Sequence, residues 1–216
     1  MSLLDKQQEI IATAQDFNTS GISLGTSGNL SMRYENGFLI TPTGIAYNNL
    51  VPDDILKCDL SGRVLSGTLI PSSEWPFHAA IYKSRNDVNA VVHVHSPYAT
   101  GLACARKTIP AFHYMVAIGG GNTIPCSDYA TFGTNELSEN IVKGLTGRIA
   151  CLMANHGMVT VGDTLDSAYK LAHEVEALAK RYCISLQCGE PVLLDDAEME
   201  MIVEKFQHYG KQFTSD

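Results

Sequence analysis

The run Asn-Ala-Val-Val-His-Val-His at residues 89–95 has the density of β-branched side chains that is typical of a strand buried on both faces. A second apolar run covers residues 149–154. Amphipathic helices are predicted at residues 2–20 and 164–186, where apolar side chains recur at helical spacing. Because helices and strands are interleaved, the pattern favours an α/β layered domain over a helical bundle or a β-sandwich.

Shorter elements are predicted between and after these segments. Residues 30–34 and 38–41 are candidate strands, and the Asn-Gly dipeptide between them is typical of a tight hairpin. The segment Pro-Ser-Ser-Glu-Trp-Pro at residues 71–76 is typical of a helix start with serine caps and an acidic first turn. A last helix is expected at residues 197–209, with Gly210 as its end.

Length and composition limit the class of protein. The 216 residues, 45% of them hydrophobic and 18% charged, are expected to form one globular domain over residues 1–216. A net charge of −8 argues against nonspecific binding to nucleic acid or to an anionic membrane. We expect a cytoplasmic protein, because no signal peptide, membrane-spanning stretch or Cys-x-x-Cys pair is visible and the six cysteines are scattered.

The sharpest chemical signal is the pair His93 and His95. Side chains alternate along a strand, so both imidazoles project from one face while Val94 turns into the core. A third candidate, His156, follows the second apolar run, and Gly157 after it allows the backbone to approach another group closely. Three neutral imidazoles suit Zn²⁺ or another transition metal ion and leave positions open for a substrate.

Glu74 admits two interpretations. As a first-turn glutamate it would only complement the helix dipole, and this is the favoured interpretation of Glu74 taken alone. Near three histidines, a carboxylate directed at the metal would instead serve as a ligand and as a general base, which reverses the preference. His78 lies one helical turn after Glu74 and is expected to form an ordinary pair with it on a helix face.

Small uncharged residues gather in predicted turns and at a predicted helix start. They are Gly28, Asn29, Thr43, Gly44, Ser72 and Ser73. In such places, free backbone N–H groups and hydroxyls can converge on an anion, although each of these segments alone is typical of an ordinary turn. Neither a Walker-type nor a Rossmann-type glycine motif is present, so a nucleotide cofactor is not indicated.

In chain order, these motifs resemble the zinc-dependent class II sugar-phosphate aldolase and epimerase family. The resemblance extends over nearly the whole chain and includes Ile-Pro-Ala-Phe-His-Tyr at residues 109–114 and Tyr-Ala-Thr-Phe-Gly at residues 129–133. It implies an α/β fold, a three-layer α/β/α sandwich around a largely antiparallel sheet. It also implies a homotetramer with one zinc ion per subunit and active sites at the subunit interfaces.

The resemblance also implies roles for individual residues. The zinc ligands would be Glu74, His93, His95 and His156. The phosphate-binding elements would be Gly28, Asn29, Thr43, Gly44, Ser72 and Ser73. Glu74 would also be the general acid/base, and Tyr114 would reach in from the neighbouring subunit to act as a proton donor. Periodicity alone favours a core position for Tyr114 instead.

The implied reaction is cleavage of a ketose 1-phosphate to dihydroxyacetone phosphate and an aldehyde. L-Fuculose 1-phosphate and L-lactaldehyde are the expected pair. Two alternatives use the same scaffold, an aldolase for 5-deoxyribulose or methylthioribulose 1-phosphate and a pentulose-phosphate 4-epimerase. Epimerases of the family typically carry aspartate where this chain has Glu74, which favours an aldolase. An adducin-like head without enzymatic activity is disfavoured, because that head lacks the histidine set.

Overall fold

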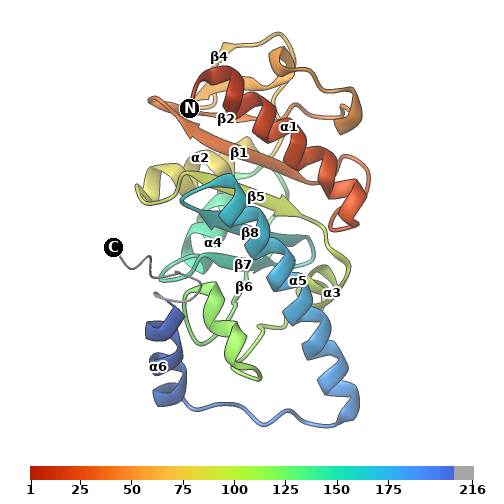
Figure 1. The fold of residues 1–216 in the computed structure, drawn as a ribbon, viewed down its shortest axis with the longest axis vertical. Coiled ribbons are helices and arrows are strands. Elements are labelled where there is room, and N and C mark those ends of the chain that lie inside the picture. Colours follow the sequence, from red (N-terminus) through yellow and green to blue (C-terminus); the bar gives the residue numbers. More distant parts are fainter. Residues whose placement is uncertain (207–216) are drawn as a thin grey trace, which may run out of the picture.

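The computed structural model describes residues 1–206, which form an α/β fold around one sheet (Figure 1). The strands are β1 (Asn29–Tyr34), β2 (Gly37–Ile40), β3 (Leu56–Asp59), β4 (Val64–Ser66), β5 (Ala90–Val94), β6 (Cys126–Ser127), β7 (Ala150–Met153) and β8 (Gly157–Gly162). The helices are α1 (Leu3–Ser20), α2 (Trp75–Ser84), α3 (Pro97–Cys104), α4 (Asn135–Gly144), α5 (Leu165–Cys188) and α6 (Asp196–Phe206).

The sheet has eight strands in the order β4-β3-β2-β1-β5-β8-β7-β6. Every neighbouring pair is antiparallel except β6 and β7, which run parallel. The expectation of a largely antiparallel sheet is therefore confirmed. Strand β5, which carries His93, lies in the middle of the sheet between β1 and β8.

Helices cover both faces of the sheet. In Figure 1, α1 and α5 lie in front of it and α2 and α4 lie behind it. One apolar cluster joins α1, α3 and α5 to sheet residues that include Val92 and Val94, and another joins α2 and α4 to residues that include Val91. Neighbouring residues of β5 thus point into different clusters and are all fully buried. This double burial explains the continuous apolar run in the sequence.

The two long predicted helices are confirmed, and local capping explains where they begin. In α1, the Ser2 hydroxyl accepts the N–H of Asp5 while the Asp5 carboxylate accepts the N–H of Ser2. Thr164 and Ser167 form the same reciprocal arrangement at the start of α5. Each arrangement satisfies two N–H groups that the first helical turn leaves free.

Two details of the predicted elements were wrong. The hairpin turn consists of Glu35 and Asn36, so Gly37 is already the first residue of β2. Gly37 is needed for strand packing, because a Cβ atom there would overlap the carbonyl group of Cys58. Helix α2 begins at Trp75 with Glu74 as the residue before it, and no side chain caps it.

Only part of the predicted last helix lies within the described residues. Helix α6 confirms the last predicted helix as far as Phe206, while Tyr209 and Gly210 lie outside the described residues. Helices α3 and α4 and strands β3, β4, β6 and β8 were not predicted from the sequence. Within residues 1–206, no helix combines the length and apolarity needed to cross a membrane.

Candidate active site

Three imidazoles meet at one end of strands β5 and β8. His93 and His95 lie on one side of β5, as the alternation predicted, with ring centroids 4.8 Å apart, and Val94 is buried in the core. His156 lies in the turn between β7 and β8, and its ring centroid is 4.8 Å from that of His93. A Cβ atom at Gly157 would lie 2.6 Å from the Val94 carbonyl oxygen, so this close approach requires glycine.

Glu74 directs its carboxylate into this cluster of imidazoles. Its Oε2 atom lies 3.1 Å from His93 Nε2, and its Oε1 atom lies 3.2 Å from His156 Nε2. The side chain makes no capping hydrogen bond with α2. One ligand atom from each of Glu74, His93, His95 and His156 lies within 4.8 Å of all the others. The interpretation of Glu74 as a residue that only complements a helix dipole is therefore wrong.

The donor set of this cluster suits a divalent metal ion. His93 donates its Nδ1 hydrogen to the Met158 carbonyl oxygen at 2.9 Å, which leaves a lone pair on Nε2. That Nε2 atom faces the Nε2 atom of His95 at 2.9 Å. Glu74 Oε1 is buried and accepts no hydrogen bond. Converging lone pairs and a buried carboxylate oxygen without a donor are what a cation between these groups would satisfy.

Burial sets the charge states of the cluster. Burial, together with the neighbouring His93, lowers the pKa of His95 to about 3 and the pKa of His156 to about 4. Both imidazoles are therefore neutral near pH 7, the form that binds metals. Burial alone would raise the pKa of Glu74, but the adjacent imidazoles, above all His93, and the Asn29 amide hold it well below its ordinary value.

Strand pairing in the sheet brings the Asn29 side chain close to Glu74. Asn29 on β1 pairs with His93 on β5, which places the two side chains side by side. The Asn29 Nδ2 group donates to Glu74 Oε2 at 2.9 Å. Asn29 is only 4% exposed. Its side chain therefore orients the carboxylate, a contact that the turn pattern did not predict.

His78 bonds to Asn29 and Ser31 rather than forming an ordinary pair with Glu74 on a helix face, so that prediction was wrong. The side chain is completely buried, with Nε2 at 2.6 Å from Asn29 Oδ1 and Nδ1 at 2.7 Å from Ser31 Oγ. Burial lowers the pKa of His78 to about 3. The spacing of Asn29 and Ser31, two residues apart on one strand, is the only sequence signal for a shared polar face.

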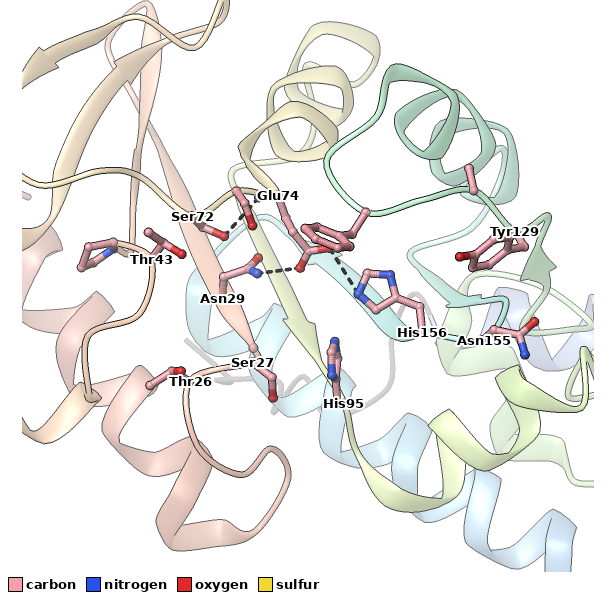
Figure 2. A pocket seen from close by; sticks show the side chains of 15 residues that line it. Thr26, Ser27, Asn29, Thr43, Ser72, Glu74, His95, Tyr129, Asn155 and His156 are labelled. Carbon is pink, nitrogen blue, oxygen red and sulfur yellow. Dashed lines mark hydrogen bonds and ion pairs between the residues drawn. The ribbon is translucent and has the colours of Figure 1, made fainter.

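A cavity of about 360 Å³ opens beside the cluster (Figure 2). Of the residues singled out in the sequence, it is lined by Gly28, Asn29, Thr43, Ser72, Ser73, Glu74, His95 and His156. Gly44 is exposed and does not line it, and His93 is buried behind it. The other lining residues were not predicted from the sequence: Thr26, Ser27, Pro42, Tyr129, Ala130, Phe132 and Asn155.

The cavity has two chemically different ends. In Figure 2, Thr26, Thr43 and Ser72 lie on one side of the imidazoles, and Tyr129 and Asn155 lie on the other. The first side presents the hydroxyl groups of threonine and serine side chains. In the described part of the chain, no lysine or arginine lines the cavity.

Tyr114 lies away from this cavity in the same chain. It begins the 3-10 helix Tyr114–Gly119, and its side chain is 50% exposed, so the core position favoured by periodicity is wrong. It lines a separate cavity with Phe112, Leu194 and Ile202.

Comparison with known proteins places the chain in a family. Residues 8–183 match the model of the class II aldolase and adducin N-terminal domain. The chain is 51% identical over 201 residues to a 5-methylthioribulose-1-phosphate/5-deoxyribulose-1-phosphate aldolase from Rhodospirillum rubrum, covering 93% of this chain and 90% of the relative. It is 47% identical over 204 residues to an L-fuculose phosphate aldolase from Escherichia coli K12, covering 94% of each.

A solved structure agrees with these sequence matches. The structure of an L-fuculose 1-phosphate aldolase superimposes with a TM-score of 0.91 and 41% identity, covering 94% of this chain and 96% of that one. The histidine and glutamate cluster able to hold a metal is present here. The chain therefore belongs to the class II aldolase and adducin N-terminal domain family and is one of its aldolases, which are metal-dependent carbon–carbon lyases.

Proposed function

We propose that this chain cleaves a ketose 1-phosphate to dihydroxyacetone phosphate and an aldehyde, with one zinc ion per subunit. The observation that carries the proposal is the Glu74 carboxylate, held against three imidazoles at the wall of an open cavity. Glu74, His93, His95 and His156 are the proposed zinc ligands. When bound, zinc supplies Lewis-acid polarisation of the substrate's ketone oxygen.

In this proposal, Glu74 also transfers the proton in the reaction. The ionised carboxylate accepts a proton from the carbon next to the ketone in the synthetic direction and returns it to that carbon during cleavage. Its low pKa favours the ionised form, and the Asn29 hydrogen bond limits its rotation. Glu74 is only 5% exposed, so bulk water has little access to its oxygens.

The phosphate group is proposed to bind at the hydroxyl-rich side of the cavity. Its proposed donors are Gly28, Asn29, Thr43, Gly44, Ser72 and Ser73. Gly44 would contribute through the turn that it forms with Thr43, since it does not line the cavity itself. Anchoring this non-reacting end fixes the reacting carbons beside Glu74.

Replacing Ser73 by alanine tests the phosphate site without disturbing Glu74, because Ser72 accepts the Glu74 N–H and Ser73 is exposed. Loss of a hydrogen bond to a dianion, worth roughly 1.5–3 kcal/mol, is expected to weaken binding of dihydroxyacetone phosphate about ten- to a hundredfold. Calorimetry with the phosphate ester, and with unphosphorylated dihydroxyacetone as the control, measures this effect. Equal loss for both ligands would contradict a phosphate contact.

L-Fuculose 1-phosphate is the proposed substrate, and 5-deoxyribulose or 5-methylthioribulose 1-phosphate is the second candidate. The 51% identical relative from Rhodospirillum rubrum favours the second candidate, and the solved aldolase structure favours the first. Phe132 provides an apolar wall for the terminal methyl or methylthio group that these sugars share. Cleavage assays across these three esters and a pentulose 5-phosphate, each with and without a chelator, decide among them and the 4-epimerase.

The active sites are proposed to lie at the interfaces of a homotetramer. Tyr114 is exposed, lies outside the cavity of its own chain and has apolar neighbours, which supports a position at a subunit contact. From there its phenol would donate a proton to the alkoxide that forms in the synthetic direction and accept it back during cleavage. A phenol, with a pKa near 10, is a competent donor to an alkoxide.

Replacing Tyr114 by phenylalanine is expected to reduce carbon–carbon cleavage by about 100-fold while sparing proton exchange on dihydroxyacetone phosphate. Exchange needs Glu74 but no proton donor to the aldehyde oxygen. Mixing Tyr114→Phe chains with Glu74→Gln chains should restore part of the activity, because some interfaces then combine both intact residues. No recovery in oligomers shown to be mixed would exclude a Tyr114 that acts across the interface.

Several wider properties belong to the same proposal. The two apolar clusters on opposite faces of the sheet support a three-layer α/β/α sandwich. Continuous strand pairing supports a single domain for the whole chain. A cytoplasmic location is supported by the six cysteines, all of which have free thiols, since such thiols persist in a reducing compartment.

A further inference from the structure

A chain of buried hydrogen bonds runs from the core of the protein to Glu74. The Tyr82 hydroxyl lies 2.8 Å from Ser31 Oγ, which lies 2.7 Å from His78 Nδ1. His78 Nε2 lies 2.6 Å from Asn29 Oδ1, and Asn29 Nδ2 lies 2.9 Å from Glu74 Oε2. The chain joins α2 to β1 and ends at the carboxylate.

The hydrogens in this chain have one consistent arrangement. An ionised Glu74 only accepts hydrogen bonds, so the Asn29 amide must present its NH₂ group to it and turn Oδ1 toward His78. His78 must then donate from Nε2, which leaves Nδ1 of the neutral ring as an acceptor. Ser31 donates its single hydrogen to that Nδ1 atom and accepts one from Tyr82. Each of the four hydrogen bonds therefore has one donor and one acceptor.

Burial makes this arrangement difficult to replace. Ser31, His78 and Tyr82 are at most 1% exposed and Asn29 is 4% exposed, so water has little access to any group that loses its partner. The ring of Phe77 stacks on the ring of His78, with centroids 4.4 Å apart and planes 22° apart. The imidazole is thus held in its plane as well as by its two nitrogens.

We propose that His78 is a positioning residue for the reaction, and that its ring, held in the Nε2–H form by Ser31, fixes the Asn29 amide with its NH₂ group toward Glu74. The inference rests on the proposed function of Glu74 as metal ligand and proton acceptor. If the amide turned over, Asn29 Oδ1 would face the carboxylate and repel it. His78 acts against that rotation, because only one of the two amide atoms can accept its Nε2 hydrogen.

Two amide substitutions distinguish the roles of the two ring nitrogens of His78. Glutamine places its NH₂ group near the position of histidine Nε2, and asparagine places its amide near Nδ1. His78→Gln should therefore keep the donor to Asn29 and lose the contact with Ser31, whereas His78→Asn should keep only the Ser31 contact. Each variant loses one buried hydrogen bond, and the unfolding free energy of both is measured, because asparagine also leaves a larger void than glutamine at this buried position.

The two variants should differ in catalytic activity and in metal affinity. His78→Asn is expected to lower kcat and the zinc affinity each at least about tenfold, the scale of effect seen when partners behind metal ligands are removed. His78→Gln should stay within about threefold of the wild type in both. Zinc affinity is measured by competition with a chromogenic chelator and needs no substrate. Thr160→Val, which removes a buried hydrogen bond to the Ala168 carbonyl oxygen of α5, in the apolar cluster that does not contain α2, controls for lost stability.

Nitrogen NMR of histidine-labelled protein reads the ring form directly. In wild-type protein, His78 should show a protonated Nε2 and an unprotonated Nδ1, and the His78→Gln variant identifies its signals. A protonated Nδ1, or equal losses in the Gln and Asn variants that follow unfolding stability alone, overturns the inference. If the wild type cleaves no ketose phosphate, the proposed function fails, whereas the ring form and the zinc-affinity difference still test His78 by themselves.

Discussion

Glu74→Gln is expected to lower the rate of ketose 1-phosphate cleavage at least about 100-fold, because it removes the proton acceptor and keeps the size of the side chain. Glutamine can still accept the Asn29 hydrogen bond through its oxygen, so the local packing should survive. Exchange of the C3 proton of dihydroxyacetone phosphate with solvent should fall in parallel. Both rates are measured at saturating zinc, since the substitution also weakens a proposed ligand.

Glu74→Asp is the matched control for this result. It keeps a carboxylate but withdraws it by one methylene group from the Asn29 amide, which lies at hydrogen-bond distance from glutamate. Its rate should fall between the wild type and the glutamine variant, because a base is present at a longer distance. Proton exchange at the wild-type rate in Glu74→Gln would mean that another residue is the base.

The part of the site that depends on local geometry was predictable from the sequence. The two-residue period of a strand places His93 and His95 on one side, whatever the rest of the fold does. The position of His156 follows from an apolar run that ends just before it, and Gly157 marks the close approach. These residues needed no knowledge of strand order.

The part that depends on strand register and helix packing was not predictable. Asn29 meets Glu74 only because β1 pairs with β5 in one register, and His78 is buried only because α2 packs over β1. The turn residues and the helical spacing seen in the sequence carry no information about those contacts. Local pattern in a single sequence therefore placed Asn29 in a turn and paired His78 with Glu74 on a helix face.

Helix α3 was also not predictable from local sequence. Its eight residues include Gly101 and carry little helical signal of their own. The free N–H groups of Tyr98 and Ala99 at its start are accepted by the Glu176 carboxylate on α5, each at 2.9 Å. A cap supplied from a distant helix leaves no trace in the local sequence, which explains why α3 was missed.

The metal site also leads to a prediction about stability. An ion bound only by the folded protein adds about 4 kcal/mol to the free energy of unfolding when its concentration is 1,000 times Kd. The midpoint of thermal unfolding should therefore fall on chelation and recover when zinc is restored. Variants that lack His95 should show a much smaller change, because one proposed ligand is gone. Scanning calorimetry of matched samples measures this.

Removing the metal is expected to abolish cleavage while the fold persists. The ligands are held without an ion, since His93 is bonded to the Met158 carbonyl oxygen and Glu74 to Asn29, and the strands that carry the site are paired along their length. Elemental analysis should find about one divalent ion per chain, and re-addition of zinc to the chelated protein should restore turnover. Circular dichroism should be nearly unchanged throughout. Full turnover in a sample verified to be free of metal would contradict both the ligand assignment and the proposed chemistry, because Glu74 alone does not polarise the ketone.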